Sequence, residues 1–128
     1  MLFRSDETWE VRGRPGLFLA GQMSGVEGYV ESAASGLLAG VNAAAWVHGR
    51  PLSTPPRTTA IGALAFYASH ADPRHYAPTN ITFGIMAPPE TPLPKRASRK
   101  QALADRALTA LQDWAAQADV ASVGTSTP

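Results

Sequence analysis

The sequence contains no cysteine, little net charge and no long hydrophobic run, and each absence excludes a class of protein. Without cysteine, its 128 residues hold no disulfide scaffold, no cysteine nucleophile and no thiolate metal site. Its 11 Lys+Arg against 10 Asp+Glu lack the basic excess of a typical nucleic-acid module. No segment approaches the ~20 apolar residues of a membrane span. We therefore expect one cytoplasmic domain at most, with no membrane segment.

The residue pattern predicts a short β-hairpin and one further strand. The hairpin is expected over residues 8–20, because polar and apolar residues alternate on one side of the turn-forming segment 12–16 and an apolar run follows it. Over residues 81–85, apolar residues alternate with Thr and Gly, and this pattern predicts the further strand. The proline-rich stretch 87–94 is expected to be an extended connector.

Three helices are expected, at about residues 29–47, from just after Thr58 or Thr59 to about residue 70, and at about 95–118. Gly49 is suited to the position that follows the end of the first helix. Thr58 or Thr59 can cap the second helix.

These elements suggest a division of the chain into four parts. We expect a strand–loop–helix unit in residues 1–50, and a proline-rich linker, helix and short strand in 51–94. Residues 95–119 then form a C-terminal helix, and 120–128 a disordered tail.

Small residues form one stripe along the first predicted helix. Ala33, Gly36, Gly40 and Ala43 are spaced by three, four and three residues. Because glycine costs a helix about 1 kcal/mol relative to alanine, two of them on one face suggest close packing against another backbone. If that partner is absent, the uncovered face becomes a surface for self-association.

The glycine-rich segment 21–29 lies between the predicted strand and this helix. Amide groups at a helix N-terminus carry partial positive charge, and glycines allow a ligand to approach them closely. The segment is therefore compatible with a pyrophosphate or with the polar edge of a flavin. It is equally compatible with a glycine-rich turn that binds nothing, because the spacing of Gly21, Gly25 and Gly28 is not the Gly-x-Gly-x-x-Gly fingerprint.

One long run carries a family resemblance. Residues 19–40, LAGQMSGVEGYVESAASGLLAG, resemble the C-terminal part of the folate- and FAD-dependent tRNA (uracil-5-)-methyltransferases, the TrmFO family. The segments TTAIGAL (58–64), ADP (71–73) and YAPTNITFG (76–84) are also similar to that family. The related MnmG (GidA) flavoproteins, which modify wobble uridines, usually have threonines where Val26 and Glu27 stand here.

The resemblance implies a fold and a reaction. The fold would be an α/β fragment, the C-terminal portion of a Rossmann-like FAD-binding domain. In the family's reaction, methylenetetrahydrofolate supplies a carbon unit, FAD reduces it with electrons from NAD(P)H, and C5 of a T-loop uridine in tRNA accepts it. The reactive cysteines and the ADP-binding loop lie upstream in the family. We therefore expect this chain to be inactive alone and to need the missing N-terminal FAD-binding segment as its partner.

Candidate site residues follow from the same resemblance. No catalytic residue and no metal ligand is expected in this chain. Arg57 and Asn80 are candidates for contacts with substrate. The candidates for FAD contact are Gly21, Gln22, Gly25, Val26, Glu27, Gly28, Tyr29 and Ser32.

Two other interpretations stay open. The chain could be a non-enzymatic orphan fragment or interaction module, or a fragment of an MnmG-like flavoprotein. The basic start of the last predicted helix also has two interpretations. Lys95, Arg96, Arg99 and Lys100 either form an ordinary solvated face or contact a phosphate, since their charges oppose the helix dipole there.

Overall fold

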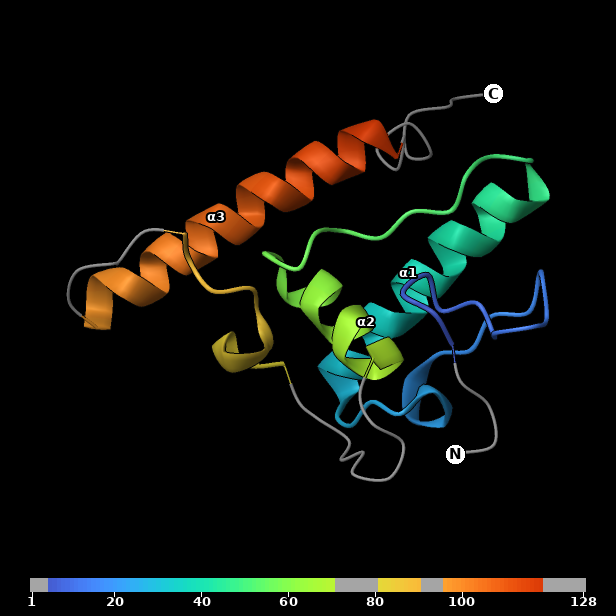
Figure 1. The fold of residues 1–128 in the computed structure, drawn as a ribbon, viewed down its shortest axis with the longest axis horizontal. Coiled ribbons are helices and arrows are strands. Elements are labelled where there is room, and N and C mark those ends of the chain that lie inside the picture. Colours follow the sequence, from blue (N-terminus) through green and yellow to red (C-terminus); the bar gives the residue numbers. More distant parts are fainter. Residues whose placement is uncertain (1–4, 71–80, 91–95, 119–128) are drawn as a thin grey trace.

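A computed structural model describes residues 5–70, 81–90 and 96–118. Figure 1 shows α2 in front of α1, with the extended linker of residues 50–59 running between these two helices and α3. In the described part, the elements are two short 3₁₀ helices, η1 (Gly21–Ser24) and η2 (Phe83–Ile85), and three α-helices, α1 (Tyr29–Val47), α2 (Ala60–His70) and α3 (Arg96–Gln117).

The helix ends agree with their sequence signals. Gly49, with φ 69°, follows the end of α1, and its N–H bonds to the carbonyl of Trp46 at 3.1 Å. Thr59 caps α2, because its Oγ1 accepts the N–H of Gly62 at 3.0 Å and donates to the carbonyl of Pro56 at 2.6 Å. Both positions were predicted from residue type alone.

The predicted hairpin and strand do not form as regular strands in the described residues. Segment 8–20 forms only isolated antiparallel bridges, one of them Glu10 to Phe18, and Trp9 interrupts any ladder with a left-handed φ of 67°. Residues 81–85 contain η2, in which the N–H groups of Ile85 and Met86 bond back to residues three positions earlier. Segment 8–20 turns back on itself, because the N–H groups of Val11 and Leu19 bond to the carbonyls of Leu17 (2.8 Å) and Trp9 (3.0 Å), but these bonds do not continue into a ladder. Alternating residues form a strand only where a neighbouring strand accepts their backbone hydrogen bonds, and residues 81–85 have no bridge partner among the described residues.

The core draws on residues from all over the chain. Trp9, Leu38 and Leu64 are almost fully buried in one cluster, and Ile85 and Trp114 pack against it with partly buried side chains. The core therefore crosses the proposed divisions at residues 50 and 94, and those divisions stay predictions.

A buried asparagine joins three parts of the molecule. Asn42, on α1 and 1% exposed, donates through Nδ2 to the carbonyls of Thr8 (3.2 Å) and Ser53 (2.9 Å). Its Oδ1 accepts the N–H of Ser53 at 2.8 Å. The hydroxyl of Ser53 in turn accepts the indole N–H of Trp114 at 3.0 Å, so the same linker residue also holds α3.

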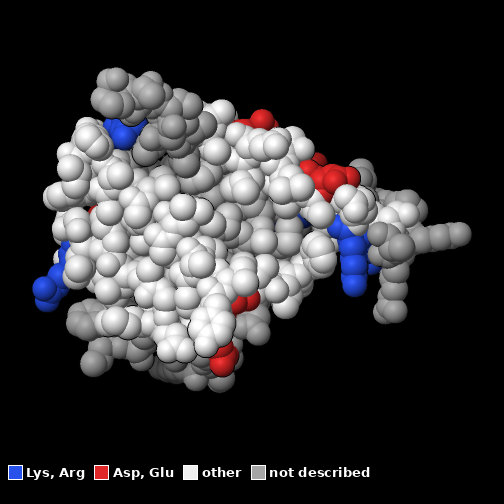
Figure 2. All heavy atoms as spheres, turned by 180° about the vertical axis from the view of Figure 1, so that it is seen from behind, with Lys and Arg blue, Asp and Glu red and all other residues white. Residues whose placement is uncertain are grey.

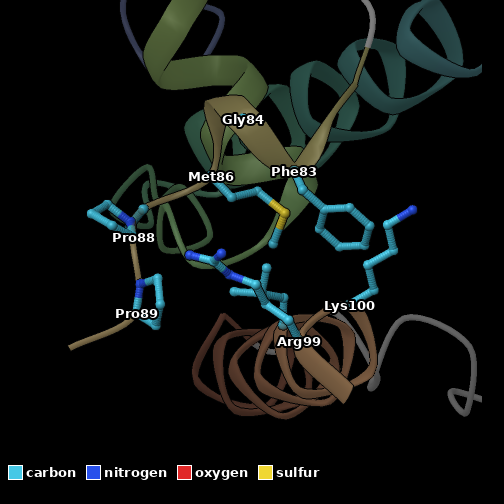
Figure 3. A pocket seen from close by; sticks show the side chains of 9 residues that line it. Phe83, Gly84, Met86, Pro88, Pro89, Arg99 and Lys100 are labelled. Atoms are coloured by element: carbon cyan, nitrogen blue, oxygen red, sulfur yellow. The ribbon is translucent and has the colours of Figure 1, made fainter. Parts of the chain in front are cut away.

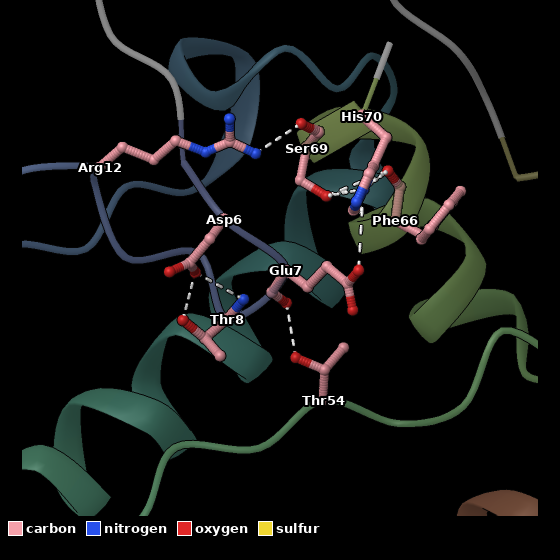
Figure 4. Close-up of polar contacts among 8 residues, drawn as sticks. All are labelled: Asp6, Glu7, Thr8, Arg12, Thr54, Phe66, Ser69 and His70. Carbon is pink, nitrogen blue, oxygen red and sulfur yellow. Dashed lines mark hydrogen bonds and ion pairs between the residues drawn. The ribbon is translucent and has the colours of Figure 1, made fainter.

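The N-terminal segment is fastened to the linker and to α2 (Figure 4). Thr54 donates its hydroxyl to the carbonyl of Glu7 at 2.7 Å, and Arg12 donates to the carbonyl of Ser69 at 2.9 Å. The Glu7 carboxylate lies 3.7 Å from Nδ1 of His70. These polar contacts replace the strand pairing that the sequence pattern predicted.

The linker approaches α2 so closely that only glycine fits at one position. An ideal Cβ on Gly62 would lie 2.2 Å from the carbonyl oxygens of both Pro55 and Pro56. An ideal Cβ on Gly40 of α1 would have no described atom within 4 Å, apart from those of its own helix backbone and chain neighbours. The two helical glycines therefore have different reasons to be present.

We predict opposite effects for Gly62→Ala and Gly40→Ala. The first should lower the free energy of unfolding by about 1–3 kcal/mol, because the added methyl group overpacks the backbone contact. The second should raise it by up to about 1 kcal/mol through helix propensity. Urea unfolding followed by circular dichroism measures both, and equal effects of the two substitutions would contradict this assignment.

Removing the Asn42 amide should loosen the linker. Asn42→Ala leaves the half-buried polar groups of Thr8 and Ser53 without their partner, and we expect a loss of about 1–3 kcal/mol of unfolding free energy. Trp114 fluorescence should also change, because its hydrogen-bond acceptor is held in place by this amide. Gln112→Ala, which removes an exposed amide on α3, is the control. A similar small loss in both variants would show that Asn42 does not organise the linker.

Candidate functional site

The turn between η1 and α1 is fixed by short-range hydrogen bonds. Ser24 donates its hydroxyl to the carbonyl of Gly21 at 2.6 Å, and the N–H of Gly25 bonds to the carbonyl of Gln22 at 3.1 Å. Gly25 ends η1 with a left-handed φ of 96°. The predicted glycine-rich loop is therefore a tight 3₁₀ turn. The geometry of this turn accounts for its glycines without any ligand.

A buried serine of α1 holds the start of this turn. Ser35 is fully buried, accepts the N–H of Gly21 at 2.8 Å and donates to the carbonyl of Ser32 at 2.8 Å. The turn thus sits at a fixed position over the first two turns of α1.

An open cavity of about 600 Å³ lies at the N-terminus of α1. Tyr29 stands at its edge with 97% of its side chain exposed. Five of the eight predicted FAD-contact residues line this cavity, where the first residues of α1 meet η1. The lining residues are Ala20, Gln22, Met23, Glu27, Gly28, Tyr29 and Ser32.

The other three predicted contact residues do not line this cavity. Val26 is 2% exposed and belongs to the core cluster, and Gly25 is buried in the turn. Gly21 is half-buried, and its N–H is taken by Ser35. The structure therefore separates the predicted set into five residues at the cavity and three that shape the turn beneath it.

The backbone at the cavity requires glycine. Gly28 precedes α1 with φ 93° and ψ 158°, a conformation essentially restricted to glycine. No side chain caps the helix there, so its first-turn amides carry no side-chain acceptor. This arrangement offers N–H donors and the positive end of the helix dipole to a ligand.

The charges around the cavity limit what it can bind. Glu27 is exposed and lines it, and none of the described residues that line it is Lys or Arg. A carboxylate that has no cation beside it among these residues disfavours a phosphate but accepts N–H or O–H donors. The cavity therefore suits a polar ring edge or a sugar hydroxyl better than a pyrophosphate.

The two predicted substrate contacts have different outcomes. Arg57 places its guanidinium carbon 3.6 Å from the centroid of the Phe66 ring, which is itself stacked on His70 at 4.0 Å. That cation–π contact explains Arg57 within the fold. Asn80 lies outside the described residues.

Sequence reasoning missed the buried polar residues of α1. Glu31 is 8% exposed, and its Oε1 accepts the N–H of Ile81 at 2.7 Å, which ties the connector before η2 to the site. Ser35 and Asn42 are likewise buried. All three lie on one helical face, at spacings of four and seven, and that regular spacing was the signal available in the sequence.

The described part of the chain contains neither a candidate metal site nor a candidate membrane-spanning helix. No group of three or more His, Cys, Asp or Glu residues there could hold a metal ion. Among its helices, none has the length and apolar character to span a membrane.

Comparison with known proteins gives two kinds of match. The family model described as glucose inhibited division protein A, GIDA, matches residues 4–51. Several curated proteins named methylenetetrahydrofolate–tRNA-(uracil-5-)-methyltransferase TrmFO match more of the chain. The protein of Symbiobacterium thermophilum is 56% identical over 109 residues, which are 84% of this chain and 24% of the relative.

Other TrmFO proteins match over the same extent. That of Anoxybacillus flavithermus is 47% identical over 107 residues, 84% of this chain and 25% of the relative. That of Streptococcus agalactiae is 51% identical over 110 residues, 85% of this chain and 25% of the relative. The chain thus spans about a quarter of the length of these relatives. The resemblance predicted from residues 19–40 is confirmed, and over most of its own length this chain is a relative of the TrmFO proteins.

Proposed function

We propose that this chain is the C-terminal quarter of an enzyme that makes 5-methyluridine in the T-loop of tRNA. The observation that carries the proposal is its 46–56% identity to proteins named methylenetetrahydrofolate–tRNA-(uracil-5-)-methyltransferase. At that identity, most site residues of the matched quarter are expected to keep their roles. A tRNA substrate also places the enzyme in the cytoplasm.

The cavity at the start of α1 fits a flavin edge. Gly28 and the uncapped amides of α1 would donate to ring or ribityl oxygens, and Glu27 would accept from N–H or O–H groups. Tyr29 would shield the bound ring from water. In such an enzyme, the chemistry that FAD supplies is reduction of the carbon unit from methylenetetrahydrofolate, with NAD(P)H as electron source.

The chain has no group for the covalent chemistry that this reaction needs. It contains no cysteine, and it has no Gly-x-Gly-x-x-Gly loop for the ADP half of FAD. In our proposal it orients the flavin and excludes water, while the nucleophile and the remaining FAD contacts come from the other three quarters of the enzyme. By itself the chain should be catalytically silent.

The outer face of α1 supports the need for such a partner. Val30, Leu37 and Val47 are 70%, 61% and 74% exposed, and an ideal Cβ on Gly36 or Gly40 would have open space around it among the described residues. Because α2 covers α1 in Figure 1, the rear view in Figure 2 faces the α1 side, and it shows a broad surface with few charged side chains. We assign this face to the rest of the enzyme. Self-association of the isolated chain through it is the alternative, which size-exclusion chromatography distinguishes.

The MnmG-like alternative has less support. The GIDA match covers only residues 4–51, whereas the TrmFO relatives match 83–85% of the chain, including α2 and the segments after it. An orphan interaction module remains the other alternative, and the following experiment tests it.

A chimera tests the proposed function. The matching segment of the Symbiobacterium thermophilum relative is replaced by residues of this chain. We expect the chimera to keep bound flavin and to methylate tRNA, because the replaced segment would contribute the same FAD contacts. Tyr29→Ala in the chimera should weaken flavin affinity by roughly tenfold or more, because Tyr29 would become a buried aromatic contact only when the flavin is bound, and less flavin should remain bound per protein.

Leu108→Ala provides the matched control, because it removes an exposed side chain of α3, 59% exposed, far along the chain from the cavity. It should leave flavin content unchanged. A chimera that folds by circular dichroism but neither binds flavin nor methylates tRNA would refute the proposal. Equal flavin content in the Tyr29→Ala and Leu108→Ala chimeras would refute the flavin site alone.

A further inference from the structure

A second cavity lies away from α1, between the segment around η2 and the first turns of α3 (Figure 3). It is open and has a volume of about 870 Å³. It is larger than the cavity at the start of α1, and the two cavities share no lining residue. Its lining residues are Phe83, Gly84, Met86, Ala87, Pro88, Pro89, Arg99, Lys100 and Leu103.

The walls of this groove are mainly apolar. Met86 and Leu103 are 7% and 8% exposed and form its base, whereas the Phe83 ring is 44% exposed. Phe83 is not needed to fill the core, so its ring is available for a flat ligand. Exposed aromatic rings next to an apolar floor are stacking platforms.

Two cations line the same groove. Arg99 and Lys100 are exposed, and the described residues offer neither of them an ion pair. The described residues that line the groove include no acidic side chain, and Glu90 lines an adjoining cavity instead. Figure 3 shows Lys100 near Phe83 in this view, while Arg99 reaches toward Pro88 and Pro89. Both stand near the positive end of α3, which adds to the attraction for an anion.

The groove has few groups that could form hydrogen bonds with the polar edge of a ligand ring. Among the described residues that line it, none has an amide or carboxylate side chain. The carbonyls of Ala87 and Pro88 already accept from Arg106, at 2.5 Å and 3.3 Å. A pterin needs acceptors for its amino group, whereas stacking on an aromatic face requires none and tolerates any base. A ligand with an unpaired base and a phosphate therefore fits better than a folate.

We propose that this groove binds single-stranded RNA, with one base stacked on Phe83 and adjacent phosphates on Arg99 and Lys100. The inference rests on the proposed function, since it assigns part of the tRNA substrate to this surface. It also gives a role to Arg99 and Lys100, whose charges oppose the helix dipole and which make no ion pair with the described residues. The near-zero net charge means that binding depends on this local site and not on the overall charge.

The test measures binding of a short fluorescently labelled uridine-rich RNA to the 128-residue chain by anisotropy. Phe83→Ala and Phe83→Leu should each weaken binding by roughly 5- to 150-fold, the range for loss of one base–aromatic stack, while Phe83→Tyr should keep it. Phe83→Leu retains apolar packing, so its loss of binding cannot be ascribed to unfolding.

The cations are tested by salt dependence. Arg99→Ala and Lys100→Ala should each reduce the slope of log affinity against log salt by about one, because each removes one phosphate contact. Arg14→Ala removes one exposed charge from the N-terminal turn and is the control, with an unchanged slope.

Several results would overturn the assignment. One is the absence of RNA binding by the unaltered chain at low salt. Another is that the groove variants match Arg14→Ala in RNA affinity and in salt dependence. A third is displacement of the RNA by folic acid at comparable concentration. This failure differs from failure of the proposed function. If a chimera binds flavin and methylates tRNA equally well with and without Arg99 and Lys100, the proposed enzyme function stands. Only the proposal that this groove binds RNA is then refuted.

Discussion

The arrangement of the chain depends on the buried amide of Asn42. In the middle of α1 it binds the N-terminal segment through Thr8 and the linker through Ser53, and Ser53 passes the connection to Trp114 of α3. A buried amide stabilises only when its donors and acceptor are satisfied together. Here its Nδ2 and Oδ1 meet three backbone groups, so one residue ties together segments that also share the apolar core of Trp9, Leu38 and Leu64.

This polar inner face determines where the functional surfaces lie. Glu31, Ser35 and Asn42 turn inward on α1 and hold the connector, the 3₁₀ turn and the linker respectively. The apolar residues Val30, Leu37 and Val47 of the same helix consequently face outward. The cavity that we assign to a flavin opens at the end of α1, where the tethered turn and the uncovered face meet. A second body docking on that face would also close the cavity.

Local signals predicted the helices better than the other elements. Thr59 and Gly49 act through their own backbone neighbours, so residue type suffices to place the ends of α1 and α2. The hairpin failed because strand formation needs partners from elsewhere, which short-range pattern does not reveal. Asn42 and Glu31 were missed for a related reason: a polar residue within a helix usually faces solvent. Five of eight predicted contact residues line the cavity, because a glycine-rich turn before a helix has few available geometries.

The distribution of polarity on α1 is itself an argument about what the chain is. A helix in a self-sufficient domain buries its apolar stripe and exposes its polar one. In α1 a carboxylate, a hydroxyl and an amide are buried, while tyrosine, valine and leucine side chains lie exposed beside two bare glycines. Leu38 and Ala39 are buried beside those polar groups, so the inner face of α1 is mixed and is covered by this chain, and in our proposal the rest of the enzyme covers the outer, apolar face. The TrmFO relatives, about four times as long as the matched segment, contain enough additional chain to cover it.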